Sequence, residues 1–408
     1  MSFKKTLAAL AVFGAFAGTA MAANVTLYGV IDESLNYTHT SDKLSADELF
    51  SEKTTSDNFG IENGINAGNR WGLKGSEELN NDLSVAFKLE SGFTADDGQE
   101  QESRLFRREA SLSLVSKTYG KLSFGRMGGI SSSAGTYDIV MAYADPFDGG
   151  SGDIWGLVHS SRYDNMVTYQ SPRLYGLQAT AQYSFKTQNV NKNGEAVAGT
   201  EGSAQADRYA SFALTGDYGP LNVVFGYEFQ DWSTKSTDVT NDGHAFFLGG
   251  NYDCGFAKTF LMGQYFFGQK SAGLFGVSDL TTDLKYVANK ADITMGNIST
   301  DKGQKGWGLA LGTEFPIASG TFTIAGYYVD STFEDVNFSY ADDEGSGEAE
   351  YDYDNRYIGV AARYVYPLSK RTALFAGAGY ANAKMDDNDG IEHKKQEAQA
   401  YLGLTHRF

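Results

Sequence analysis

Apolar and polar positions alternate every second residue over many short segments of the chain. In 83–91, Lys88 and Glu90 share one face and the apolar side chains share the other. The same period of two recurs in 25–32 and 176–185. This period is typical of β-strands, because successive side chains of a strand point to opposite faces of the sheet. The pattern therefore predicts strands with one apolar and one polar face.

The segments between the predicted strands fall into two classes of length. The short, turn-like ones are the seven segments 77–82, 117–120, 171–176, 217–220, 253–255, 316–320 and 367–372. The long, polar or glycine-rich ones are expected to be eight loops at roughly 39–66, 92–105, 127–160, 186–207, 230–243, 269–304, 331–354 and 382–396. We find no segment of helical periodicity that would cover the apolar face. Seven turns and eight loops connect sixteen strands, which predicts an all-β, antiparallel transmembrane barrel.

The two ends of the predicted sheet must meet if the barrel lies in lipid. A free sheet edge would leave unpaired backbone groups in the hydrocarbon, where water cannot satisfy them. The last strand, which ends at Phe408, is therefore expected to pair with the first, which begins near Val25. The negative mean hydropathy of -0.35 does not argue against a membrane, because barrel strands average apolar and polar positions.

The N-terminal residues 1–22 have the layout of a cleaved secretory signal peptide. Two lysines precede an apolar run over 7–17, and a small-x-small site follows at 20–22. An N-terminal membrane anchor is the alternative, and the shortness of the apolar run argues against it. We expect one barrel domain over residues 23–408.

Composition excludes a fold held by internal disulfides and a helical membrane protein. The single cysteine, Cys254, permits no internal disulfide. The longest stretch without a charged residue after the leader is 315–329, shorter than the roughly 20 apolar residues of a membrane-spanning helix. The chain has 48 Gly, 5 Pro, 25 Tyr and 27 Phe, a composition that favours strands and turns.

Seven blocks of sequence carry a resemblance to a known family. They are VTLYGVID (25–32), NRWGLKGSEEL (69–79), AFKLESGF (86–93), FRREASLSLVSKTYGKLSFGR (106–126), SRYDNMVTYQSP (161–172), YPLSKRTALFAGAGY (366–380) and GLTHRF (403–408). In order and content they resemble the general diffusion porins of Gram-negative outer membranes. The resemblance implies a sixteen-stranded, usually trimeric barrel in the outer-membrane lipid. It also implies that Phe408 is the C-terminal signal read by the barrel-assembly machinery during insertion.

A barrel of sixteen strands is too wide for side chains to fill, so a water-filled channel for ions and small hydrophilic solutes is expected. By resemblance, 127–160 is the third extracellular loop, which folds inward and narrows the pore. It holds Asp138, Asp145, Asp148 and Asp153 and no lysine or arginine. These acids, above all Asp138, Asp145 and Asp148, predict the acidic side of a constriction.

The opposite side of the constriction is expected to be basic. Alternation places Arg70, Lys88, Arg107 and Arg162 in the inward register. Basic wall and acidic loop together would set up a transverse field that orients water and polar solutes. The alternative for each cation is a solvated charge of the lumen that has no special role. Arg108 is also an alternative to its neighbour Arg107.

The charge balance limits the partners. The chain carries 51 acidic and 33 basic residues, a net charge of -18, so nucleic acid is not expected to bind. Nine of the acids lie in 331–354 without a cation among them. They are explained by a solvated surface loop or, alternatively, by a loop that collects divalent cations. The balance predicts a weak cation preference.

No enzyme, cofactor or metal site is expected. His159 and Ser160 are the one suggestive pair, but chain neighbours seldom converge, and no Gly-x-Ser-x-Gly motif is present. The segment 238–243 begins like a calcium loop, yet Gly249 stands where a bidentate glutamate is needed. The alternative to a channel is a barrel that acts through its long acidic loops, as an adhesin or phage receptor, and conducts poorly.

Overall fold

Most of the chain after its N-terminal segment is described by the structure. The computed structural model describes residues 24–47, 49–133, 135–149, 154–233, 239, 241–342, 345–387 and 390–408. The expected signal peptide over 1–22 lies outside these residues, and so does Asp153.

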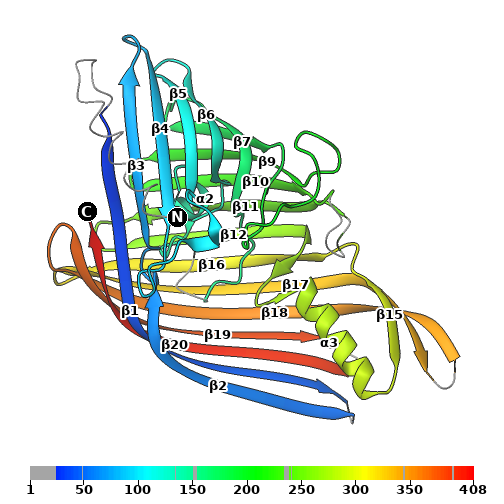
Figure 1. Ribbon diagram of the computed structural model, residues 1–408. Helices are drawn as coiled ribbons and strands as arrows, with labels where there is room; N and C mark the ends of the chain where they lie inside the picture. Colours follow the sequence, from blue (N-terminus) through cyan, green and yellow to red (C-terminus); the bar gives the residue numbers. More distant parts are fainter. Residues whose placement is uncertain are drawn as a thin grey trace.

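Antiparallel strands form the wall of the molecule (Figure 1). They are β1 (Thr26–Ala46), β2 (Phe50–Asn63), β3 (Arg70–Glu78), β4 (Leu83–Gly92), β5 (Glu109–Ser116), β6 (Gly120–Gly128), β7 (Arg162–Gln170), β8 (Leu177–Ser184), β9 (Arg208–Tyr218), β10 (Leu221–Asp231), β11 (Gly243–Asp253), β12 (Lys258–Gln269), β16 (Gln304–Ile317), β17 (Gly320–Asp342), β18 (Gly345–Pro367), β19 (Thr372–Asp386) and β20 (Ile391–Arg407). β2 and β3 both pair with β1, so they fill one position of the wall. The wall has sixteen positions, which confirms the expected antiparallel barrel.

The first and last strands close the barrel. β1 pairs with β20 from Val30 opposite Arg407 to Ala46 opposite Ile391. Closure leaves no strand edge that lipid would have to satisfy. The expected pairing of the two ends of the chain is confirmed.

Side chains alternate between the two faces of the wall as the sequence predicts. Leu27, Leu112 and Leu248 point outward and are exposed on the isolated chain. Ser123 and Gln182 point inward and are buried. Apolar side chains on the outside and polar ones inside are the arrangement that a bilayer around the barrel requires.

The strands are joined by short turns at one end and longer segments at the other. All seven expected turns connect consecutive strands. Three expected loops, 39–66, 331–354 and 382–396, were wrong, because paired strands occupy most of each segment. The outer ends of β1 and β2, for example, remain paired until Ala46 lies opposite Phe50. The outer parts of these hairpins lie beyond the apolar belt and carry polar residues on both faces. Because the alternation of apolar and polar positions is lost there, the sequence pattern resembles that of a loop.

The segment 269–304 contains a helix that the sequence analysis missed. It holds β13 (Ser271–Ala272), β14 (Phe275–Gly276), α3 (Val277–Lys290) and β15 (Thr294–Ser299), and β15 pairs with the outer part of β17. The α3 residues Leu280 and Leu284 are buried on one face. Among the described residues, no helix has the length and apolarity needed to cross a membrane.

The apolar core lies inside the barrel, on one side of it. The segment 129–161 between β6 and β7, called the inner loop below, contains the short helix α2 (Val140–Ala144), which lies against β10, β11 and β12. Val140 and Met141 of α2 are fully buried, as are the inward side chains of Phe247 and Met262. This packing fills part of the lumen and fixes the inner loop to the wall.

Candidate functional site

Hydrogen bonds hold both ends of the inner loop to the wall. Near its start, the carboxylate of Glu228 on β10 accepts hydrogen bonds from the backbone N–H of Ser131 (3.1 Å), from its hydroxyl (2.9 Å) and from the Tyr209 hydroxyl (2.7 Å). Near its end, the side-chain amide of Gln264 on β12 accepts from the N–H of Val158 (2.8 Å) and donates to its carbonyl (3.1 Å). Buried polar groups that are paired in this way favour one loop conformation.

The tip of the inner loop is fixed separately, through Asp145. This carboxylate is buried and accepts a hydrogen bond from the Tyr327 hydroxyl on β17 (2.9 Å). Its other oxygen accepts from the N–H of Gly149 (2.8 Å), which closes the turn at the tip. The guanidinium of Arg363 on β18 lies 4.8 Å from the ring centre of Phe147. Asp145 is therefore enclosed by the wall and by its own loop.

Asp148, three residues further on, lines the open lumen. It borders a cavity of about 640 Å³ that Arg70, Lys88 and Arg407 also line. A second cavity of about 440 Å³ is bordered by Asp148, Arg70 and Arg407 again. The backbone of Asp148 has a φ of 54°, a left-handed conformation that is rare for residues other than glycine. The structure thus brings one acid of the tip together with cations of the opposite wall.

Arg407 is a residue of this cavity that the sequence analysis did not select. It lies at the end of β20, in the same register as Tyr401 and Thr405, whose side chains are buried inside. The alternation of the last strand carried this signal, since every second residue back from Arg407 points into the barrel. Arg363 on β18 was missed in the same way.

Lys88 belongs to a network of paired charges on the wall. Its ammonium group lies 2.8 Å from a carboxylate oxygen of Glu109 and 3.4 Å from one of Glu90. Glu90 also pairs with the guanidinium of Arg108 (2.8 Å) and accepts a hydrogen bond from the Tyr28 hydroxyl (2.8 Å). The two cations and two carboxylates of this network balance, so this part of the wall is close to neutral.

Arg107 lies just before β5 and contacts the segment that precedes it. Its guanidinium is 3.0 Å from a carboxylate oxygen of Glu102. Arg108, not Arg107, occupies the position beside Glu90, which is the alternative that the sequence left open. Arg107 is thus placed outside the two cavities that Arg70 borders.

Arg162 and Asp138 have contacts within or next to the inner loop. Arg162, the first residue of β7, donates a hydrogen bond to the carbonyl of Ser133 (3.0 Å). Asp138 accepts a hydrogen bond from the N–H of Ala142 (3.2 Å) in the short helix α2. Neither residue borders the cavities that Asp148 lines.

Pairing divides the cations of the lumen into two groups. Lys88 and Arg108 have carboxylate partners within 4.0 Å. In the part of the chain that the structure describes, Arg70, Arg162 and Arg407 form no such ion pair. Arg70 and Arg407 border the open cavities, so their unpaired guanidinium groups place positive charge on this side of the opening.

Comparisons with known proteins agree with this architecture. Residues 6–388 match the family model described as Gram-negative porin. An outer membrane porin protein of Bordetella pertussis is 31% identical over 419 residues, covering 99% of this chain and all of that protein. Outer membrane porin protein 32 of Delftia acidovorans is 25% identical, with 99% and 100% covered. The solved structure of an anion-selective porin from Comamonas acidovorans has a TM-score of 0.61 at 19% identity, over 95% of this chain and 100% of that chain.

Proposed function

Because the chain belongs to the Gram-negative porin family, whose members are passive channels of the outer membrane, we propose that its pore is narrowest where the tip of the inner loop faces the basic wall. The observation that carries this proposal is the position of Asp148, which borders both lumen cavities together with Arg70 and Arg407. A solute that passes this point has an anionic group on one side and guanidinium groups on the other.

The residues of the constriction have different roles in this proposal. Arg70 and Arg407 are the charged wall opposite Asp148, and Lys88 extends the wall as part of its paired network. Arg162 contributes positive potential next to the inner loop. The field between the two sides orients water and polar solutes and penalises apolar solutes, because these cannot replace the ordered water.

The remaining charges of the predicted site support the constriction without facing it. Asp145 ties the tip to Tyr327, and Asp138 caps the first turn of α2. Arg107 lies on the approach, where Glu102 pairs with it. Only one of the three predicted acids therefore acts directly on passing solutes.

The positions of the charges favour anions at the constriction. Arg70, Arg162 and Arg407 are cationic groups without an ion-pair partner among the described residues. The acids that border the two cavities with Arg70 are Asp148, Glu62 and Glu90, and Glu90 is paired with Lys88 and Arg108. The acids of the outer hairpins lie further away, and salt screens a charge over roughly 8 Å at physiological ionic strength. The weak cation preference predicted from the net charge is the alternative. The Comamonas acidovorans porin, which has the same fold, is anion-selective, and this agrees with our proposal.

Assembly follows from membership of the family. We expect a homotrimer in outer-membrane lipid, exported with the help of the N-terminal leader and inserted by the barrel-assembly machinery. The position of Phe408, at the end of the strand that closes the barrel, supports a role for it as the recognised terminus.

Reversal potentials in a salt gradient across a planar bilayer test the proposal. We expect anion preference in the wild type and a lower preference in Arg70→Gln and Arg407→Gln. The control is Arg371→Gln, which removes an exposed arginine from the turn between β18 and β19. Equal reversal potentials in all four proteins would exclude the constriction. A barrel that inserts but carries no current would support the interaction role of the long loops.

A further inference from the structure

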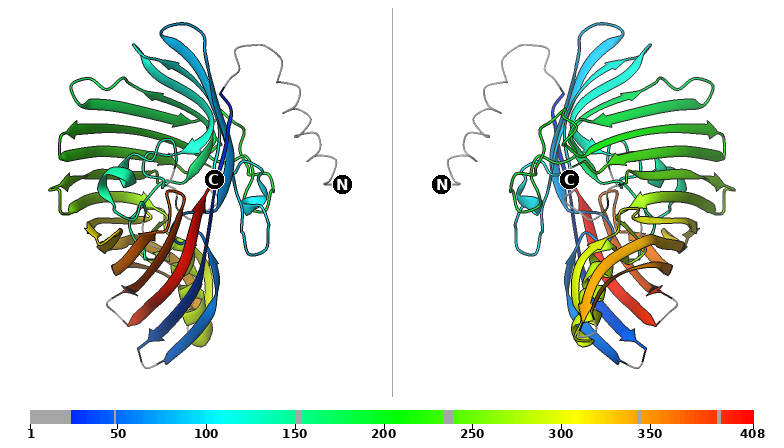
Figure 2. Two further views of the ribbon diagram at one scale, coloured as in Figure 1. Left: turned by 90° about the vertical axis from the view of Figure 1, so that its left-hand side faces the viewer. Right: turned by 90° about the vertical axis from the view of Figure 1, so that its right-hand side faces the viewer.

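The helix α3 lies against the inside of the barrel mouth, beside strands that are distant in sequence. Figure 2 shows it next to the outer parts of β1, β2 and β20 in both views. At its C-terminal end, Glu52 of β2 accepts hydrogen bonds from the Tyr286 hydroxyl (2.6 Å) and the Lys290 ammonium group (2.7 Å). Before the helix, the N–H of Gly273 donates to the carbonyl of Gly156 in the inner loop (2.7 Å). The helix therefore links the outer wall to the loop at the constriction.

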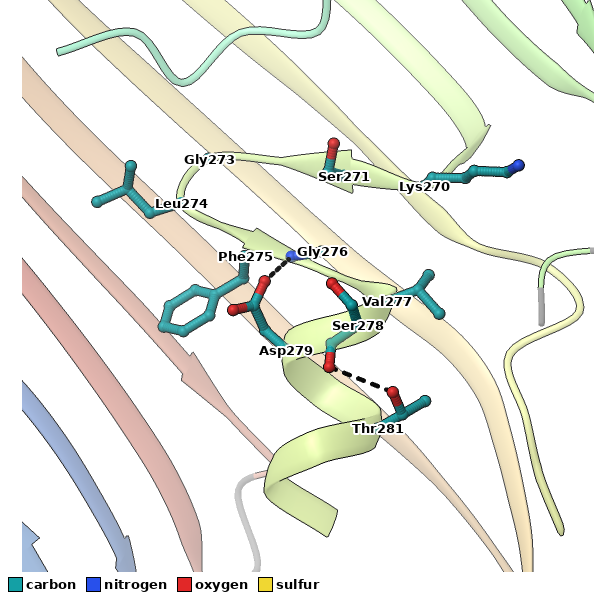
Figure 3. A pocket seen from close by; sticks show the side chains of 10 residues that line it. All are labelled: Lys270, Ser271, Gly273, Leu274, Phe275, Gly276, Val277, Ser278, Asp279 and Thr281. Carbon is teal, nitrogen blue, oxygen red and sulfur yellow. Dashed lines mark hydrogen bonds between the residues drawn. The ribbon is translucent and has the colours of Figure 1, made fainter. Parts of the chain in front are cut away.

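The N-terminal part of α3 is attached to β20 by an ion pair and an aromatic contact. Figure 3 shows the carboxylate of Asp279 turned back to the N–H of Gly276, which donates a hydrogen bond to it (2.9 Å). The other oxygen of Asp279 accepts from the ammonium group of Lys395 on β20 (2.5 Å). The same ammonium group lies 4.8 Å from the ring centre of Phe275. Charge and aromatic contacts thus fasten this end to β20.

The middle of α3 is attached through one buried histidine. Nδ1 of His393 on β20 lies 2.6 Å from a carboxylate oxygen of Asp283 on α3. Nε2 of the same ring lies 2.7 Å from a carboxylate oxygen of Asp42 on β1. The His393 and Asp283 side chains are only 7% and 8% exposed, and the Phe275 ring packs against the imidazole. Both ring nitrogens therefore face carboxylates.

With both carboxylates ionised, this geometry requires a protonated imidazole. Ionised carboxylates only accept hydrogen bonds, and a neutral imidazole has a single N–H to donate. Both contacts of His393 are satisfied only when both nitrogens carry hydrogen. Loss of the proton leaves one carboxylate facing a nitrogen lone pair. It also leaves the buried charge of Asp283 without its cation, which is strongly unfavourable in a protein interior.

One other cation, Lys395 of β20, lies near enough to act on Asp283, but Asp279 binds it directly. From α3, Asp279 is paired with Lys395 of β20, and Asp283 is the carboxylate that contacts the ring. From β1, Asp42 is the second carboxylate. Glu52 of β2 is bonded to Tyr286 and Lys290, and Met385 of β19, which lies opposite His393, is uncharged. Burial raises the pKa of Asp283, so strong acid also weakens the contact by protonating it.

We propose that α3 is a pH-sensitive strap of the barrel mouth, held along its length on β1 and β20 while His393 is protonated and loosened at its middle when His393 loses that proton. The bonds of Asp279 to Lys395 and of Glu52 to Tyr286 and Lys290 remain, so the middle of the helix becomes mobile between two attached ends. This motion loosens the contact of Gly273 with the inner loop. The channel then passes from a steady current to a fluctuating one as the outside becomes alkaline.

Spin-label mobility of α3 tests the strap without relying on conductance. The label is attached at Lys285→Cys, an exposed position of α3, in a Cys254→Ser background, and the purified full chain is studied in lipid vesicles from about pH 5 to about pH 9. We expect an immobile label in acid and a mobile label in alkali. The variant His393→Gln should be mobile throughout. The control His406→Gln removes the other histidine of β20, which contacts Thr372, and should behave like the wild type.

A second variant separates proton sensing from simple damage to the fold. In Asp42→Asn, the amide N–H can donate to Nε2 of a neutral His393, whose Nδ1–H still donates to Asp283. We therefore expect α3 to remain docked in alkali, with the pH response lost. A wild-type label whose mobility ignores pH, or an Asp42→Asn protein that responds as the wild type does, would overturn the proposal. Because the readout is mobility, either result leaves the porin function untouched.

Discussion

The backbone of Phe408 exchanges two hydrogen bonds with that of Gly29, one from Gly29 N–H to the Phe408 carbonyl (3.0 Å) and one back (3.1 Å). The Phe408 ring lies over the same glycine, and a Cβ at position 29 would be 2.2 Å from its Cζ atom. The last residue of the chain is thus both a strand partner and a side chain seated on the first strand.

Gly29→Ala should weaken the closure of the barrel. The added methyl group forces the Phe408 ring out of its place, and overpacking of this kind costs about 1–3 kcal/mol. The measurement is the melting temperature of the barrel, read from the heating temperature at which its band on a gel shifts from the folded to the unfolded position. The matched control is Gly60→Ala, where a Cβ meets no atom within 4 Å. Equal melting of the two variants would contradict a structural role for the Phe408 ring.

Alternation in the sequence was enough to predict the wall and part of the site. It placed Arg70 and Lys88 inside, because a residue's face depends only on its position in a strand. It did not identify Arg407, although the same rule applies there. The outer parts of β1 and β2 were missed because polar residues occupy both faces of that hairpin, which removes the apolar signal.

The roles of the acids could not be predicted from the sequence. Asp145 and Asp148 are three residues apart in one loop, and both look equally able to face the pore. The structure separates them, because Tyr327, 182 positions away, binds the buried Asp145, whereas Asp148 borders the cavities of the lumen. Contacts between distant residues decide such questions. The helix α3 was missed for a related reason, since its apolar face is short and interrupted by Asp283.

The two acids should respond differently to the same substitution. Asp148→Asn removes a lumen charge, so the reversal potential should shift toward anions. Asp145→Asn leaves the lumen charge in place but weakens the bonds to Tyr327 and Gly149, so it should lower stability or raise current noise. Reversal potential and gel-shift melting are measured on both. If the two variants have the same reversal potential and the same melting temperature, Asp145 and Asp148 do not have different roles.

Glu228→Ala should free the start of the inner loop. The substitution removes the acceptor of Ser131 N–H, its hydroxyl and the Tyr209 hydroxyl. Ser131 keeps its bonds to the Ser160 hydroxyl, so the Tyr209 hydroxyl is the donor that loses its acceptor, at a cost of about 1–3 kcal/mol. We expect a noisier single-channel current and faster proteolysis within the loop. Glu77→Ala, which removes an exposed carboxylate at the other end of the barrel, is the control. A steady current in Glu228→Ala would show that apolar packing alone holds the loop.

The turn between β3 and β4 should make the barrel sensitive to acid through Asp82. Its carboxylate accepts hydrogen bonds from the Ser116 hydroxyl (2.6 Å) and from the hydroxyl (2.8 Å) and N–H (3.0 Å) of Thr118. These bonds hold the pKa of Asp82 below its ordinary value. A lowered pKa means that the folded state binds the proton less readily than the unfolded state does.

The stabilisation by Asp82 is therefore present above the ordinary carboxyl pKa of about 3.9 and is lost as the pH falls through the lower value of the folded state. Asp82→Asn should lower the melting temperature of the barrel at neutral pH and have little effect in strong acid. The control Glu78→Gln neutralises an exposed carboxylate at the same end of β3. The prediction is wrong if the melting temperatures of the wild type and of Asp82→Asn differ by the same amount at both pH values. That result would mean that the charge of Asp82 does not contribute to stability.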